Sequence, residues 1–168
     1  MYRSTSALTL ALLVSLAVDG MAQRRTGTSG VPGGPLTLSA RIDGRTYKAM
    51  GPGSCKHTSD ASIYDVPAAL WMVEYGNSAG GDIKRLNLTL WKPKGGSADQ
   101  VSLSLETGRS SHRINSGGKA RSVGSGTVTV SRLGSGGRLN LKGKDAKGKK
   151  IELTVKCPAY AGVEAEGG

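Results

Sequence analysis

The sequence predicts an all-β domain, either an antiparallel β-sandwich or a small barrel of about seven to nine strands, closed by one disulfide. Three observations lead to this prediction. Apolar and polar residues alternate in several short segments, as half-buried strands require, and no window shows a convincing helical period. Turn-forming glycines, 26 in the whole chain, separate many of these segments. The two cysteines, Cys55 and Cys157, both lie after residue 22 and can close the domain with one bond.

The first 22 residues have the layout of a secretory signal peptide. Arg3 precedes a 12-residue apolar run, Ala7–Val18, and the small residues Gly20 and Ala22 come before a cleavage point at Gln23. The run is shorter than the roughly 20 residues of a membrane-spanning helix. We therefore expect export to the periplasm or the medium, without integral membrane insertion. The remaining chain is predicted to contain a flexible leader (23–35), one β-sandwich domain (36–158) and a disordered C-terminal tail (159–168).

The first predicted strands follow the leader. Leu36–Ile42 alternates apolar and polar residues, and the Asp43–Gly44 pair after it favours a two-residue hairpin turn. Thr46–Ala49 is expected to return as the partner strand. The next segment, Pro52–Pro67, has no such alternation and is predicted to be an irregular loop.

The middle of the chain predicts three further strands. Leu70–Tyr75 is a short apolar run suited to a strand that is buried on both faces. Lys84–Trp91 and Gln100–Glu106 alternate leucine or valine with polar residues. The stretch 108–126 is polar and interrupted by glycines, so it is predicted to be a loop with one weak edge strand near His112–Asn115.

The last third of the chain has the clearest strand pattern. Three segments alternate in the same way and are separated by glycine-containing turns: Thr127–Leu133, Arg138–Lys142 and Lys149–Lys156. Together with the five strands predicted above, they make eight clear strands. No connection contains an obvious crossover helix, so antiparallel pairing is expected. Cys157 continues the parity of the inward residues of the last strand, and its sulfur is therefore expected at the core or its rim.

The two cysteines are expected to form a disulfide. One even pair in an exported chain, without a C-x-x-C motif, favours a structural bond over a redox site. Closing a loop of 102 positions removes unfolded-state entropy worth about 4.7 kcal/mol in the chain-entropy model. This constraint matters because the chain has no Phe and only 4% aromatic residues with which to build a core.

Residue patterns predict no catalytic residue, no metal site and no cofactor. His57 and His112 are the only histidines, and neither has cysteine or carboxylate neighbours at a usual zinc-ligand spacing. Both are expected to be solvent-exposed loop residues. The Gly-Ser-Gly sequences are not followed by a predicted helix, as a nucleophile elbow requires. The alternative is a small secreted hydrolase that uses His57 or Asp60 in the loop Pro52–Pro67.

Positive charge gathers around one predicted hairpin turn. The formal net charge is +11, and five lysines opposed only by Asp145 lie within nine residues: Lys142, Lys144, Lys147, Lys149 and Lys150. Such a tip attracts polyanions, with an affinity that falls in salt, and predicts an anionic envelope polymer or an acidic protein as partner. Alternatively, the lysines only raise solubility and discourage edge-to-edge association. Nucleic acid is not expected, because aromatic residues suited to stacking on bases are missing nearby.

Trp91 is a candidate surface contact. Alternation places its side chain on the opposite face of its strand from Leu86, Leu88 and Leu90. If that face is exposed to solvent, Trp91 is the best single aromatic contact on the surface.

The order of these pieces resembles that of the mycobacterial surface lipoprotein antigens of the LpqH type. The shared features are leucine-rich strands together with Ile42-Asp43-Gly44, Cys55, the glycine-rich hairpin Leu139–Gly148 and the terminal stretch Ile151–Cys157. The resemblance covers about residues 36–158 and implies a non-enzymatic β-sandwich with no catalytic residues. This chain has no lipobox cysteine after its apolar run, so lipid anchoring at the surface is not implied.

Overall fold

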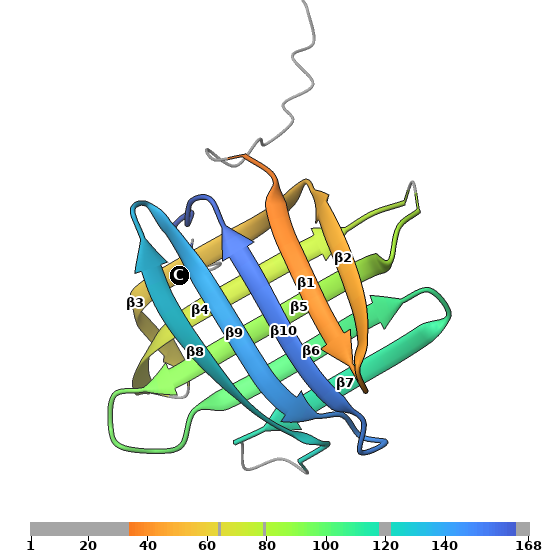
Figure 1. The fold of residues 1–168 in the computed structure, drawn as a ribbon. Helices are drawn as coiled ribbons and strands as arrows, with labels where there is room; N and C mark the ends of the chain where they lie inside the picture. Colours follow the sequence, from red (N-terminus) through yellow and green to blue (C-terminus); the bar gives the residue numbers. More distant parts are fainter. Residues whose placement is uncertain (1–33, 64, 79, 118–121, 164–168) are drawn as a thin grey trace, which may run out of the picture.

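Ten strands form two five-stranded sheets in the computed structural model, which describes residues 34–63, 65–78, 80–117 and 122–163 (Figure 1). The predicted signal peptide and nearly all of the predicted leader lie outside the described residues. Sheet A has the strand order β2-β1-β10-β9-β8, and sheet B has the order β3-β4-β5-β6-β7. The strands are β1 (Leu36–Ile42), β2 (Arg45–Gly51), β3 (Gly53–Ile63), β4 (Val66–Gly76), β5 (Ile83–Pro93), β6 (Gln100–Thr107), β7 (Ser110–Ser116), β8 (Ser125–Leu133), β9 (Gly136–Lys144) and β10 (Lys150–Cys157).

The two sheets are connected at two corners. Gly51 ends β2 and Gly53 begins β3, so the chain passes there from sheet A to sheet B. At the other corner, Asn115 of β7 and Val123 exchange backbone hydrogen bonds of 2.7 and 2.9 Å. Neighbouring strands pair antiparallel throughout, and the strands of one sheet cross those of the other steeply (Figure 1). Of the two predicted architectures, the sandwich is confirmed.

No helix long and apolar enough to cross a lipid bilayer occurs among the described residues.

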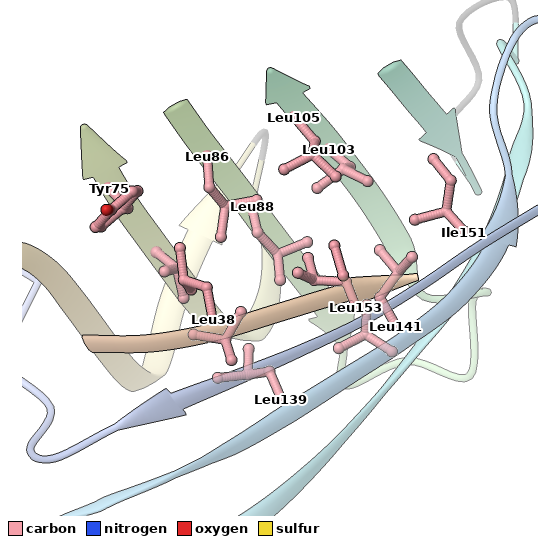
Figure 2. Close-up of a cluster of buried hydrophobic side chains, with 14 of the residues drawn as sticks. Leu38, Tyr75, Leu86, Leu88, Leu103, Leu105, Leu139, Leu141, Ile151 and Leu153 are labelled. Carbon is pink, nitrogen blue, oxygen red and sulfur yellow. The ribbon is translucent and has the colours of Figure 1, made fainter. Parts of the chain in front are cut away.

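The core lies between the sheets and is built mainly from leucine. Strand β1 shows why, because it buries its four apolar residues and turns the residues between them outward. Figure 2 shows Leu88 and Leu103 from sheet B and Leu141 and Leu153 from sheet A as members of one buried cluster. Each such side chain stabilises the fold by about 1.5–3 kcal/mol when it leaves water. Burial of leucine side chains therefore provides most of the apolar contact between the sheets, with few aromatic residues.

The Asp43–Gly44 turn is confirmed. Both residues have positive φ, 46° and 88°, as a two-residue hairpin turn between twisted strands favours. Asp43 Oδ1 also accepts a hydrogen bond of 2.9 Å from the backbone N–H of Lys150. The β1–β2 turn is thereby held beside the start of β10.

The predicted number of strands is too low, because two polar segments are also strands. Strand β3 occupies much of Pro52–Pro67, for which the sequence predicts a loop. A register shift between Thr58 and Ala61 interrupts its alternation, which conceals the strand in the sequence. The weak strand near His112–Asn115 is confirmed and extends over the whole of β7. Both are edge strands of sheet B, where pairing to a single neighbour tolerates polar residues.

The disulfide between Cys55 and Cys157 is confirmed. It joins β3 of sheet B to β10 of sheet A, with Cα atoms 6.0 Å apart and both residues buried. Beyond β10 the chain continues onto β3: Ala161 donates to the carbonyl of Cys55 at 2.9 Å and accepts from the N–H of His57 at 3.0 Å. The hydrogen-bonded chain thus continues past residue 158, where the sequence predicts the domain to end, and these bonds cover part of the outer edge of β3. Residues 164–168 lie outside the described residues.

Trp91 does not provide a surface contact. Its side chain faces away from Leu90, as predicted, but only 6% of the residue is exposed. The register places it between Leu70 of β4 and Gln100 of β6. Trp91 is therefore buried, and the condition for a role in binding is not met.

Candidate anion-binding surface

The β9–β10 hairpin brings the five predicted lysines together at one end of sheet A. Lys142 and Lys144 lie on the last part of β9, Lys147 and Lys149 lie in the turn, and Lys150 begins β10. All five residues are exposed. Their proximity was expected, because they are neighbours in the sequence.

Asp145, the acidic residue that lies among these lysines in the turn, is not at the surface. Asp145 is only 3% exposed, and its Oδ1 accepts hydrogen bonds from the backbone N–H groups of Lys147 (2.8 Å) and Lys149 (2.9 Å). These bonds close the turn around the carboxylate. The Ala146 N–H donates to the carbonyl of Arg113 in β7 at 3.2 Å, so the turn is also tied to sheet B.

His112 of β7 completes the anchoring of the turn. Its Nδ1 lies 2.8 Å from Asp145 Oδ2, and Nδ1 is the donor because an ionised carboxylate can only accept. His112 is 5% exposed, so the expectation of a solvent-exposed loop histidine is wrong. The residue lies on an inward position of a strand. We call His112 and Asp145 the clamp of the hairpin.

The electrostatics of the clamp favour a charged Asp145. Burial alone would raise the pKa of its carboxyl, but hydrogen bonds from His112 and from the Lys149 and Lys147 amides outweigh burial, and the pKa lies below its ordinary value of 3.8. The carboxylate is therefore ionised at neutral pH, and its charge interacts with His112 and with the backbone amides inside the turn. It does not neutralise the lysines from the solvent side.

One lysine of the hairpin has an ion-pair partner. Lys149 Nζ lies 3.6 Å from Asp43 Oδ2 in the β1–β2 turn. Among the described residues, the ammonium groups of the other four have no carboxylate within ion-pair distance. Most of the positive charge of the hairpin thus faces water.

The structure extends the positive charge over the outer face of four of the five strands of sheet A. Strand pairing places outward cations from four different strands on this face, and the strands contribute one acid, Glu152, which lies opposite both Arg41 and Lys142. The face has no aromatic side chain among its described residues. Its cations are Arg41, Lys48, Arg138, Lys142, Lys144, Lys150 and Lys156.

Two pairs of like charges stand directly opposite each other on the β9–β10 hairpin. Lys144 faces Lys150 near the turn, and Arg138 faces Lys156 near the other end. Opposed like charges on neighbouring strands are destabilising. An anion placed between them removes that repulsion, so both pairs favour an anionic ligand on this face.

The residues expected in a hydrolytic site have other partners. His57 donates from Nδ1 to the carbonyl of Leu70 at 2.9 Å and accepts at Nε2 from the guanidinium of Arg132 at 3.0 Å. Its ring stacks on Trp71 with centroids 4.3 Å apart, so His57 is not a loop histidine in free solvent. Asp60 instead accepts hydrogen bonds from Lys94 and Ser59, both at 2.6 Å, and these bonds lower the pKa of its carboxyl.

No group of three or more His, Cys, Asp or Glu side chains suited to holding a metal ion occurs in the part of the chain that the structure describes.

Comparison of the chain with protein families, curated proteins and solved structures found no match. The resemblance to the LpqH-type antigens accordingly stays a prediction.

Proposed function

We propose that this chain is an exported, non-catalytic binding module of the cell envelope that holds an anionic partner through its basic β9–β10 hairpin. The observation that carries the proposal is the burial of Asp145. Asp145, the one acidic residue within 142–150, turns inward onto His112, while the five lysines of this stretch stay exposed. The hairpin therefore presents concentrated positive charge to solvent.

Two features support export. Residues 1–22 have the layout of a signal peptide. The Cys55–Cys157 bond is of the kind that forms and persists in oxidising compartments outside the cytoplasm. An envelope or secreted location also places the hairpin among the acidic polymers and proteins that its charge would attract.

The clamp supports a role in binding beyond solubility. Lysines that serve only solubility need no fixed backbone beneath them. Here three hydrogen bonds to Asp145 hold the turn, and a fourth ties Ala146 to β7. A pre-organised turn loses less conformational entropy when a ligand binds.

Retention on a phosphocellulose column across a salt series tests the proposal. The variant Lys144/Lys147/Lys149→Ala is expected to elute at clearly lower salt than the parent protein. The matched control is Lys56/Lys84/Arg109→Ala, which removes three exposed cations outside the hairpin and should elute close to the parent. Equal elution of the two variants would show that only total charge matters and would contradict the proposal.

A further inference from the structure

Two open hollows lie end to end along β1 on the outer face of sheet A. One, of about 410 Å³, contacts Thr37 and Ser39 of β1, with Lys48 on one side and Lys156 on the other. The second, of about 530 Å³, contacts Arg41, Asp43, Lys150 and Glu152 around the two turns. We call the two hollows together the β1 trough. From Thr37 to Asp43 the trough is about 20 Å long, at roughly 3.4 Å per residue.

The trough is lined by small polar residues and by the exposed apolar Met50, with cations along its sides. Thr37 and Ser39 form its floor at one end, and Gly44 and Gly148 lie at the other. The cations on its walls come from three neighbouring strands: Lys48 from β2, Arg41 from β1, and Lys150 and Lys156 from β10.

Of the two acids in the trough, Asp43 is engaged and Glu152 lies between cations. Asp43 accepts from the Lys150 N–H at 2.9 Å and lies 3.6 Å from Lys149 Nζ. Glu152 has Arg41 on one neighbouring strand and Lys142 on the other. The cations at the opposite end, Lys48 and Lys156, have no carboxylate within ion-pair distance among the described residues.

The position of β1 decides which class of polyanion fits. β1 lies inside sheet A, paired to β2 on one side and to β10 on the other, so its backbone groups are used within the sheet. An acidic peptide therefore cannot bind here by adding a strand, which requires a free edge. A nucleic acid would lack an aromatic surface for its bases. A ligand here must be held by side chains, which are cations, hydroxyl groups and the apolar Met50.

We propose that the β1 trough holds a linear acidic polysaccharide. Carboxylate or sulfate groups of the polymer contact the cations on the walls, and its hydroxyl groups hydrogen-bond to Thr37 and Ser39 on the floor. This inference rests on the proposed anion-binding function and adds the class of ligand and its place on the sheet. The basic hairpin then forms one end of a longer site.

Filling the trough without changing any charge tests the inference. The variant Thr37→Ile/Ser39→Ile places two bulky apolar side chains on the floor, and β-branched residues are well accepted in strands. The matched control, Thr127→Ile/Thr129→Ile, makes the same kind of change on β8 of the same face, away from the trough. Urea unfolding of each variant confirms that it is folded. The trough variant is expected to bind polygalacturonate about tenfold more weakly than the parent, and the control to bind like the parent.

Three probes separate the possible outcomes. Polygalacturonate should bind, whereas neutral dextran and polyglutamate of similar length should bind much more weakly. If both isoleucine variants bind polygalacturonate like the parent while the hairpin alanine variant still loses retention on phosphocellulose, the trough is refuted and the proposed function stands. If polyglutamate binds as tightly as polygalacturonate, the assignment to a polysaccharide is wrong. Tight binding of dextran would show that the anionic groups are not needed, which would also overturn the inference.

Discussion

Replacing Asp145 by alanine tests whether the clamp holds the basic hairpin. The change leaves His112 and the amides of Lys147 and Lys149 without their partner in a buried site. Breaking a buried pair of this kind destabilises a protein by about 3–5 kcal/mol. Asp145→Asn is the matched control, because its side-chain oxygen can still accept from both amides and its NH₂ can donate to the other tautomer of His112. We expect that variant to lose only about 1 kcal/mol.

Urea unfolding at neutral pH, followed by the fluorescence of Trp71 and Trp91, measures both free energies. Amide hydrogen exchange at Lys147 and Lys149 adds a local measurement, which should accelerate in the alanine variant. A loss below about 1 kcal/mol for Asp145→Ala would refute the clamp, since one unpaired buried group already accounts for that much. Equal losses in the alanine and asparagine variants would refute the role assigned to the hydrogen bonds.

The same variants have a defined pH dependence. The pKa of Asp145 lies below 3.8 in the folded protein, so its ionised form contributes stability at every pH above that ordinary value. The contribution is lost as the pH falls through the lower, folded-state pKa. The difference in unfolding free energy between the parent and Asp145→Asn should therefore shrink below pH 3.8. A difference that stays constant down to full protonation would contradict the assignment.

Two further predictions concern the scaffold. Replacing Cys55 and Cys157 together by alanine should lower the free energy of unfolding by about 2–4 kcal/mol, because the bond closes a separation of 102 residues; reductant should then lower the melting temperature of the parent but not of the variant. Gly136→Ala should destabilise the fold by about 1–3 kcal/mol, because its Cβ would overlap the backbone of Cys157 and Pro158, whereas Gly95→Ala enters open space and should be nearly neutral. Equal urea midpoints for these two alanine variants would contradict the overlap.

The predicted strands that proved correct are those whose apolar residues fill the core. In β1 and β10 every second side chain must leave water whatever its partner is, so alternation alone identifies the strand. The edge strand β3 lacks this signal, because its inward positions include Cys55 and His57 and a bulge shifts its register. Strand β3 forms because it pairs with β4, and the sequence of β3 alone does not reveal this pairing.

The candidate site also has one part that the sequence predicts and two parts that it does not. The lysines of the hairpin could be predicted to lie together because they are adjacent in the chain. The clamp could not, because 33 positions separate His112 from Asp145 and only the packing of sheet A on sheet B joins them. The β1 trough could not be predicted either, since it depends on the order β2-β1-β10, which places Lys48 beside Ser39 on one side of β1 and Lys156 beside Thr37 on the other.

The clamp and the outer face of sheet A are parts of one energetic arrangement. In the free protein Lys144 repels Lys150 on the opposite strand, and Arg138 repels Lys156. The leucine core on the inner side of the same strands and the buried carboxylate of Asp145 beneath the turn offset this repulsion. A polyanion on the outer face would relieve it directly, so the residues that weaken the free sheet are the ones that gain most from a partner. A ligand that binds only the folded state also stabilises that state by mass action. Charge that only served solubility could be spread over both sheets, without two opposed pairs on one hairpin.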